Sequence, residues 1–371
     1  MARAESTNSM RRLNFIKEFM QINSQVLSQY YNYTNSALRI VSEALHVQYP
    51  FQYAWAVALI IAIIVFLVIL SIIDSLYIYV MSWAERKLMA RMQSRHGPTY
   101  VGKFGFLQNF ADLVKLLAKE NIIPDNAEKI FPAVVPAIFA LLFFILIFIP
   151  LSRGFVGINA SLGLIIVFAL LSFMPFLMFL VAWSSGNKFS SISAQRSVLM
   201  MVGYEIPMLL SLVPIVALSG GFEFYSIVTA QSAHWFILLM PIGFIVFFIT
   251  LLAELERQPF DLREADSELI AGWLNDVSAP YYALVLFIDY TRMFIGTLLI
   301  SILFLGGWIG PAFLPPAAWL IVKVILLTLF IVIIRATMIR MRIDKIMKFG
   351  WNWLLPLSVL NLLITFVLFI K

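Results

Sequence analysis

Long apolar segments alternate with short polar ones along most of this 371-residue chain. Eight windows of about membrane-spanning length can be drawn, and charged residues are almost absent from them. The windows cover residues 55–80, 131–150, 155–183, 198–219, 235–253, 279–305, 317–334 and 351–370. Backbone groups find no water inside a bilayer, so these segments are predicted to be helices; they lack the alternation of barrel strands. The pattern therefore predicts an all-α integral membrane protein with about eight transmembrane helices and amphipathic interfacial helices in its first long loop.

The polar segments divide the chain into an extension and a membrane domain. Residues 1–54 are too polar to cross a bilayer and have no signal-peptide pattern, so we expect an N-terminal extension that is amphipathic in part. Residues 55–371 are expected to form one eight-helix membrane domain. Two of its loops, 81–130 and 254–278, are long and charged, which favours a docked partner.

Basic residues predict the orientation of the chain. The loops after the first, third, fifth and seventh windows hold 17 of the 26 Lys and Arg residues, and the intervening loops hold Arg153 alone. The positive-inside rule puts the first set in the cytoplasm and both termini outside. The net charge of +6 therefore reflects membrane topology, and no nucleic-acid groove is predicted.

Composition excludes several kinds of chemistry. The chain has no cysteine, which excludes disulfides and thiolate-bound iron–sulfur clusters or zinc, so we expect no redox centre in this chain. The three histidines are scattered, so no metal site is expected. The sequence contains no phosphate loop, dinucleotide fingerprint or nucleophile triad.

The segment from Glu254 to Asp276 concentrates acidic residues beside the membrane. It holds seven of the 20 carboxylates: Glu254, Glu256, Asp261, Glu264, Asp266, Glu268 and Asp276. Acids crowded beside a bilayer repel one another and tend to keep protons, which suggests proton handling or an electrostatic contact. The alternative is a solvated loop helix, capped by Asp261 and ended by Gly272, which explains Glu264 but neither Glu254 nor Glu256.

Two arginines lie in the same loop. Arg257 is expected to pair with Glu254, Glu256 or Asp261, because so many acids need a cationic partner. Arg263 is expected to be the more exposed of the two arginines.

The first long loop opens with a basic segment. If the helix of the first window continues into it, Lys87, Arg91 and Arg95 fall on one face. The segment 107–119 has an apolar stripe typical of a helix in the membrane interface, formed by Leu107, Phe110, Val114 and Leu117. Composition favours an anchor for lipid headgroups; the alternative is a wall of a cavity for an amphipathic, lipid-soluble ligand.

Three ionisable residues lie inside predicted spans, where charge is costly. Glu205 has no partner in its own helix, so a proton-exchanging role is the leading hypothesis. Asp289 and Arg292 are one turn apart, and they either neutralise each other or serve a relay. Asp74 and Lys323 are expected to snorkel from near span ends, and we assign them no role.

Several motifs, in chain order, closely resemble those of one family. They are Glu85 to Pro98, Val101 to Gln108, Ala111 to Leu116, Trp183 to Lys188, Tyr204 to Pro207, Glu254 to Gly272, and Arg335 to Asp344 with Gly350 and Trp351. Together they resemble the membrane subunit designated 1 or H in proton-pumping NADH:quinone oxidoreductase (respiratory complex I). The likeness covers roughly residues 55–371.

The resemblance implies a membrane subunit of a quinone-reducing, proton-translocating oxidoreductase, which forms the quinone chamber and begins a carboxylate proton path. The implied relay residues are Glu205, Glu254, Arg257, Asp261, Glu264, Asp266, Glu268 and Asp289. The implied chamber residues are Arg86, Arg91 and Arg95.

The resemblance also implies partners and a location. Quinone is the implied substrate, and iron–sulfur clusters lie only on partner subunits. The implied partners are the iron–sulfur and quinone-site subunits of the peripheral arm, antiporter-like and small membrane subunits, and membrane lipid. The implied location is the plasma (inner) membrane of a bacterium or archaeon.

The chain departs from the family pattern at three acids. Asp276 is followed by Val-Ser where Glu-Tyr-Ser is usual, and Asp266 and Asp289 stand where Glu is typical. Asp shortens the reach of each carboxylate by one methylene, and these changes suggest a divergent lineage. Two other functions stay open: the membrane anchor of an energy-converting hydrogenase or formate hydrogenlyase, and a stand-alone ion transporter.

Overall fold

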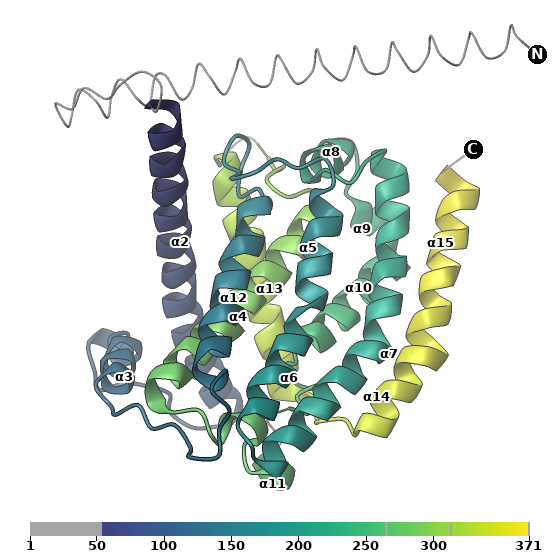
Figure 1. Cartoon of the computed structure of the whole chain (residues 1–371). Coiled ribbons are helices and arrows are strands. Elements are labelled where there is room, and N and C mark those ends of the chain that lie inside the picture. Colours follow the sequence, from purple (N-terminus) through teal and green to yellow (C-terminus); the bar gives the residue numbers. More distant parts are fainter. Residues whose placement is uncertain (1–53, 264–265, 312–313, 370–371) are drawn as a thin grey trace, which may run out of the picture. The chain divides into compact units, whose positions relative to one another are not determined.

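The computed structural model describes residues 54–263, 266–311 and 314–369. The chain divides into two units, Met1–Ile69 and Leu70–Lys371. Of the first unit, the structure describes only the start of helix α2. The second unit holds the remaining helices and all candidate site residues (Figure 1).

The described residues form helices, turns and an isolated bridge between Ser152 and Phe155. The longer helices are α2 (Ala54–Met92), α4 (Phe131–Phe148), α5 (Gly163–Ser172), α6 (Met174–Ser184), α7 (Lys188–Ser219), α10 (Pro241–Glu254), α12 (Ala279–Phe304), α13 (Pro316–Thr337) and α15 (Leu355–Phe369). The shorter elements are η1 (Lys103–Gly105), α3 (Gln108–Leu117), α8 (Phe224–Ala230), α9 (Phe236–Leu239), α11 (Asp266–Leu269), η2 (Gly272–Leu274), α14 (Ile343–Phe349) and η3 (Gly350–Leu354).

Seven helical segments in the described part are long and apolar enough to cross a membrane. They match seven of the eight predicted windows, and the all-α integral membrane class is confirmed. The window 235–253 instead contains α9 and the shorter apolar helix α10. Met240 leaves helical geometry there (φ −135°), and Pro241 starts the new helix because proline suits the first helical turn.

Helix α12 is the centre of the bundle. Every residue from Thr291 to Phe304 is buried, as expected for a helix that is covered all round. It packs against α4, α13, α8 and α3. The end of α12 nearer Ala279 is less covered, and this is where its side chains reach the candidate site.

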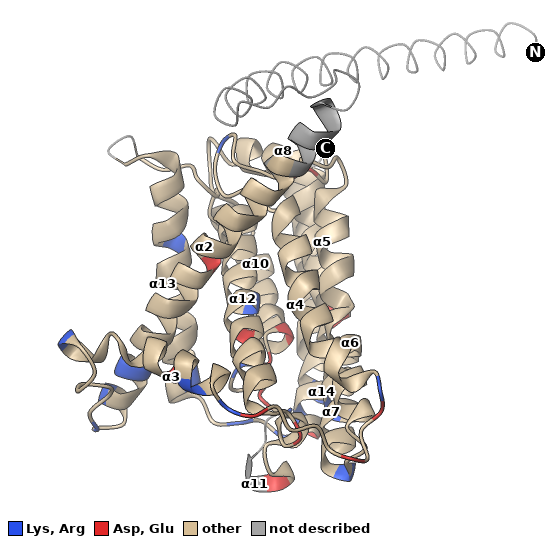
Figure 2. Ribbon diagram, turned by 60° about the vertical axis from the view of Figure 1, so that its left-hand side comes forward, with Lys and Arg blue, Asp and Glu red and all other residues tan. Residues whose placement is uncertain are grey.

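Charged residues gather at one end of the helices. The segments that follow α2, α6, α10 and α13 lie at the same end, with α3, α11 and α14 (Figure 1). Most Lys, Arg, Asp and Glu residues shown in Figure 2 lie at this end, and a few lie within the helical body. We call it the charged end.

Candidate functional site

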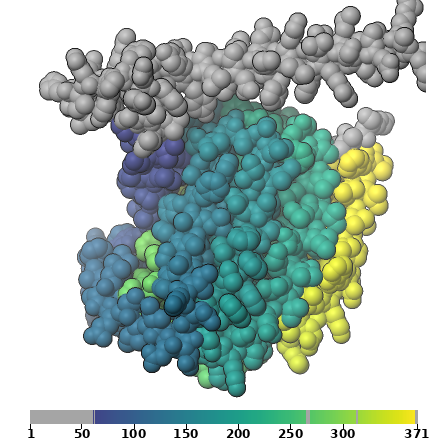
Figure 3. All heavy atoms as spheres, viewed as in Figure 1, coloured from purple at the N-terminus to yellow at the C-terminus, as the bar shows by residue number. Residues whose placement is uncertain are grey.

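A cavity of about 470 Å³ lies at the charged end between α2, α3, α12 and the loop that begins at Leu255. Figure 3 shows green surface, from chain near the start of α12, between the blue α3 region and the neighbouring helices. One part of the wall is apolar, lined by Phe110, Leu113 and Leu116 of α3 and by Val285, Leu286 and Phe287 of α12. The polar part is lined by Arg86, Asp112, Arg257, Asp289, Tyr290 and Arg335. Such a mixture suits an amphipathic ligand with a polar head and an apolar tail.

Glu85 holds the polar side of the cavity together. This α2 carboxylate is only 3% exposed. It forms ion pairs with Arg335 of α13 and, at 3.4 Å, with Arg257, and it accepts a hydrogen bond of 2.8 Å from the Tyr290 hydroxyl of α12. The Arg257 guanidinium also lies over the Tyr290 ring, 5.2 Å from its centroid. Three helices and the acidic loop therefore meet at one buried carboxylate.

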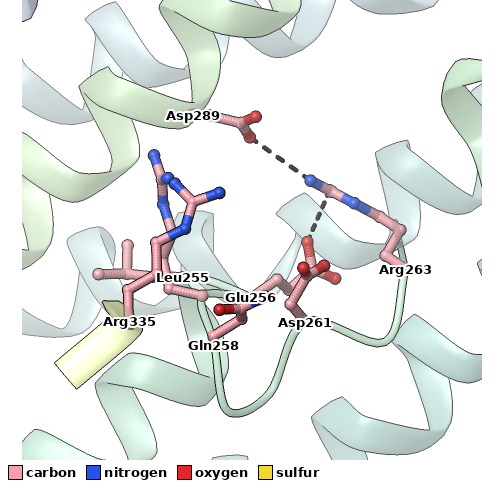
Figure 4. A pocket seen from close by; sticks show the side chains of 8 residues that line it. Leu255, Glu256, Gln258, Asp261, Arg263, Asp289 and Arg335 are labelled. Carbon is pink, nitrogen blue, oxygen red and sulfur yellow. Dashed lines mark hydrogen bonds and ion pairs between the residues drawn. The ribbon is translucent and has the colours of Figure 1, made fainter. Parts of the chain in front are cut away.

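Glu256 is the centre of a second cluster, directly beyond the first. Its Oε2 atom lies 2.6 Å from Arg263 and 3.1 Å from Arg292, and its Oε1 atom accepts a hydrogen bond from Ser197. Arg263 also reaches Asp289 at 3.4 Å, as Figure 4 shows. Two acids and two arginines make this cluster neutral. Burial raises the pKa of Glu256, but the two arginines outweigh that effect and hold the pKa below its ordinary value.

The loop around Glu256 has unusual backbone geometry. Glu256 has a φ of +49°, and Ile270 and Ala271 have φ values of +51° and +64°, in a region that side chains with a Cβ rarely adopt. Strain of this kind persists only where surrounding contacts fix it. A cavity of only about 20 Å³, room for about one water, lies among these loop residues (Figure 4).

Three serines on one face of α7 fix this loop. Ser190 donates to Asp276 (2.8 Å), Ser193 donates to the backbone oxygen of Arg263 (2.7 Å), and Ser197 donates to Glu256. Gly272 lets the loop approach, because a Cβ there would lie 2.2 Å from the oxygen of Arg263. These serines are absent from the predicted site; their spacing on one helical face was the available signal.

Glu254 connects the loop to the membrane interior. Its side chain is 3% exposed, and its Oε1 atom has no hydrogen-bond partner among the described residues. Its backbone oxygen accepts a hydrogen bond from Arg292. Tyr204 of α7 contacts its carboxylate, and the carboxylate of Glu205, the next residue, repels it. The helices α7 and α10, which carry these two expected relay residues, pack against each other.

Comparison with known proteins identifies the family. A family model described as NADH dehydrogenase matches residues 60–366, which is most of the chain. The chain belongs to this family. The H subunit of the NADH-quinone oxidoreductase of Dehalococcoides mccartyi is 41% identical over 295 residues, which are 79% of this chain and 82% of that protein. The H subunit of the same enzyme from Carboxydothermus hydrogenoformans is 38% identical over 288 residues, 76% of this chain and 81% of the relative. The H subunit of the F(420)H(2) dehydrogenase of Methanosarcina mazei is 38% identical over 300 residues, which are 76% of this chain and 85% of that protein.

In this member of the NADH dehydrogenase family, the three expected chamber arginines are not equivalent. Arg86 lines the cavity, whereas Arg91 and Arg95 are exposed and are not among its lining residues. The expected alignment of Arg95 on the helix is wrong, because α2 ends at Met92 and Ser94 has a φ of +55°. The residues Gly97-Pro98 follow, and neither favours a continued helix.

The remaining acids of the loop occupy different places. Asp261 does not begin a helix, since α11 starts at Asp266, and it pairs with Arg340 at 3.0 Å. Glu268 is exposed and pairs with Arg196 at 2.6 Å; the hydrogen bond from Arg196 lowers its pKa. Glu264 lies outside the described residues, and so does the side chain of Asp266.

Other expectations about charged residues need correction. Arg263 is not the more exposed arginine: it is 3% exposed and lies 4.5 Å from the Trp273 ring centroid. Asp289 and Arg292 do not neutralise each other, because they pair with Arg263 and Glu256 respectively. Helical spacing alone could not reveal these partners, which lie in another segment.

The two residues expected to snorkel are in fact buried. Asp74 is 1% exposed and accepts a hydrogen bond from Thr291. Lys323 donates to the backbone oxygens of Leu305, Gly307 and Ile309, all within 2.8 Å. Both side chains point into the bundle because a polar partner lies there.

The amphipathic helix α3 is tied to α2 by the Arg86–Asp112 ion pair and by hydrogen bonds from Asn109 to Tyr79 and Ser82. None of the residues of α3 is buried, and its stripe residues Phe110, Val114 and Leu117 are at least half exposed, as suits a helix in the membrane interface. Arg86 bonds to Asp112 at 2.6 Å, and Gln108 donates to Asp112 at 3.0 Å. Partial burial raises the pKa of Asp112, but these hydrogen bonds and the Arg86 charge outweigh it and hold the pKa below its ordinary value of 3.8.

This pKa shift gives a pH-dependent expectation for α3. Because the pKa of Asp112 is lowered in the folded protein, ionised Asp112 stabilises the docked helix α3 at any pH above the ordinary carboxyl range. This stabilisation is lost as pH falls through the lowered pKa. Amide exchange of residues 108–117, corrected for its intrinsic pH dependence, should be constant from about pH 8 to 5 and rise below about pH 4. In Asp112→Asn this exchange should be faster than in the wild type at pH 7 and should not rise further below about pH 4, although the Asn109 hydrogen bonds to α2 remain. Equal protection in both proteins at pH 7 would contradict this role for the pair.

Proposed function

We propose that this chain is the membrane subunit of a complex I-type, redox-driven proton pump and that its cavity is the quinone chamber. The observation that carries the proposal is a half-apolar cavity of about 470 Å³ with a polar side built around buried charge, in a chain of this family. The relatives that are subunits of NADH-quinone oxidoreductase support quinone as the substrate. The apolar wall from α3 and α12 suits a lipid tail, and the polar wall suits a quinone head.

The proposed chemistry of the chain is binding, orientation and proton transfer. Arg86 lines the cavity with guanidinium donors that fit a quinone carbonyl oxygen. Arg91 and Arg95 are proposed to lie beside the opening of the cavity, on the side that faces a partner subunit. Iron–sulfur clusters on partner subunits supply the electrons, and quinone reduction creates a demand for two protons next to the Glu85 carboxylate.

The proposed proton path begins in the acidic loop. Asp261, Arg257, Asp289 and Glu254 lie around the charge cluster, Glu205 continues from it along α7, and the exposed Glu268 and the loop acids Glu264 and Asp266 are its proposed outer members. A change of charge in the cavity alters the Glu85 cluster first. The backbone between Glu254 and Arg257 then transmits this change to Glu256, which is a coupling between sites in the thermodynamic sense.

The proposed assembly and orientation follow the same reasoning. The charged end faces the cytoplasm and docks the iron–sulfur and quinone-site subunits, both termini lie outside, and antiporter-like and small membrane subunits adjoin the helices. The membrane is the plasma (inner) membrane of a bacterium or archaeon. Purification of the intact complex tests this proposal: iron–sulfur partners with bound quinone support it. A nickel protein without quinone would instead indicate a hydrogenase anchor, and a homo-oligomer alone would indicate a transporter.

Arg86→Ala is expected to raise the quinone KM about tenfold, because one charge-assisted hydrogen bond is worth roughly 1.5–3 kcal/mol. The rate with an artificial acceptor that takes electrons upstream should not change. Lys119→Ala is the matched control, since it removes an exposed positive charge of the same loop that does not line the cavity. Equal losses of both activities in Arg86→Ala would point to misassembly and against a quinone contact.

A further inference from the structure

Helix α2 presents two neighbouring stripes to the rest of the molecule. The first stripe lines the cavity and consists of Ser75, Ile78, Tyr79, Ser82 and Arg86. The second stripe is buried and consists of Leu70, Asp74, Tyr77, Met81 and Glu85. Two carboxylates, Asp74 and Glu85, thus lie on one buried stripe beside the cavity wall. At 1.5 Å per residue they are about 16 Å apart along the helix, so Asp74 lies about three turns farther from the charged end than Glu85.

Asp74 is a buried acid with an incomplete set of partners. Its side chain is 1% exposed, and its Oδ2 atom accepts a hydrogen bond of 2.7 Å from Thr291. Its Oδ1 atom is fully buried and has no partner among the described residues. Within the described part of the chain it makes no ion pair either. A carboxylate anion in such a place is costly, whereas a neutral acid is tolerated and has a proton to give.

The charged and titratable groups near this stripe are already engaged elsewhere. Tyr77 shares a hydrogen bond of 2.7 Å with Thr328, and Tyr290 donates to Glu85. Arg292 pairs with Glu256, and both Arg335 and Arg257 pair with Glu85. No group in the described part of the chain fixes Asp74 in its charged form.

Helix α12 connects Asp74 to the charge cluster at the cavity. The two hydroxyls that bind the acids of α2 come from adjacent residues, Tyr290 for Glu85 and Thr291 for Asp74. A shift of Tyr290 that follows a change at Glu85 therefore moves the donor of Asp74 too. On the other side, the neighbour of Asp74 in the chain, Ser75, lines the cavity.

We propose that Asp74 is a proton-exchanging group of the pump, separate from the acidic loop, that gives its proton to the cavity side and takes one back in each cycle. The carboxyl O–H bond breaks and its electron pair stays on Asp74, while the proton passes to an oxygen of the reduced quinone in the cavity. Return of a proton restores the acid, so the step needs no oxidant or reductant. This inference rests on the proposed function, because the proton demand comes from quinone reduction.

The alternative is that Asp74 only accepts the Thr291 hydrogen bond and braces α2 against α12. Asp74→Asn separates the two roles, because the amide oxygen can still accept this bond but cannot titrate. Thr328→Val is the matched control: it removes a buried hydrogen bond between the same stripe of α2 and a neighbouring helix, and it leaves every acid in place.

The test uses the complete complex in proteoliposomes, with infrared difference spectra between the resting state and turnover. The wild type should show a C=O band of a protonated carboxyl that responds to turnover and shifts on ¹³C-aspartate labelling. Asp74→Asn should lose this band and about a hundredfold in coupled turnover, the lower range for loss of a proton-transfer group. Thr328→Val should keep both the carboxyl band and the wild-type rate of coupled turnover.

If Asp74→Asn does not assemble, a second variant that perturbs Asp74 without replacing it still tests the proposal. Thr291→Val should retain the aspartate band at a shifted frequency, because the hydrogen bond to Asp74 is lost. No aspartate band in the wild type, a band unaffected by Thr291→Val, or wild-type pumping by Asp74→Asn would overturn the inference alone. Absence of quinone reduction by the wild type would overturn the proposed function and this inference with it.

Discussion

Arg263→Met is expected to destabilise the subunit by about 3–5 kcal/mol, the range for removing one partner of a buried ion pair. Arg263 is 3% exposed and neutralises both Glu256 and Asp289. Its loss leaves Glu256 with Arg292 alone, removes the ion pair of Asp289, and removes the guanidinium contact with Trp273. The measurement is the midpoint temperature at which the detergent-solubilised complex loses this subunit.

Arg257→Met is the matched comparison and should destabilise the subunit less than Arg263→Met. Glu85 keeps Arg335 and the Tyr290 hydroxyl when Arg257 is removed, so its negative charge stays compensated. Arg263→Lys should recover part of the loss, because it keeps the charge but cannot bind two carboxylates with one planar group. Equal midpoints for Arg257→Met and Arg263→Met would show that the Glu256 cluster does not hold the loop.

The acidic loop was predictable from the sequence only in part. The density of acids singled out the segment as a candidate, because it is a property of consecutive residues. The assignment of Arg263 as the exposed arginine was wrong, because its partners Glu256 and Asp289 come together only after the loop folds back onto α12 and α7. Ion pairs across separate segments leave no periodic signal.

The helices were predictable for a different reason. A bilayer demands a long apolar stretch for each span, so windows of hydropathy found the spans, apart from the break at Met240 and Pro241. Their ends were less predictable: α2 continues past its window to Met92, and α7 begins before its window at Lys188. Polar residues end the apolar window, but the backbone hydrogen bonds of a helix continue through them.

Buried polar residues inside the spans were the hardest to interpret. Asp74 and Lys323 lie near window ends, where long side chains often reach water. The structure buries both, because Thr291 for Asp74 and three backbone oxygens for Lys323 provide partners inside the bundle. Such partners depend on which helices pack together, and hydropathy carries no information about that.

Glu254→Gln and Glu205→Gln are each expected to lower coupled turnover by about a hundredfold, the lower range for removal of a proton-transfer group. Glu254 is buried with one carboxylate oxygen that has no partner among the described residues, and Tyr204 contacts it from α7, where Glu205 is the next residue. Glutamine preserves shape and hydrogen bonding but cannot carry a proton, so assembly should survive. Glu128→Gln, at an exposed acid of the charged end, is the control and should pump like the wild type.

The double variant tests whether the two acids serve one path. Groups that act in series are not additive, so Glu254→Gln with Glu205→Gln should be no slower than the slower single variant. The assay is proton pumping measured together with quinone reduction in proteoliposomes. Losses that multiply would place the two carboxylates on separate paths. Wild-type pumping by either single variant would make that residue a structural hydrogen-bonding group, and the proton path would have to bypass it.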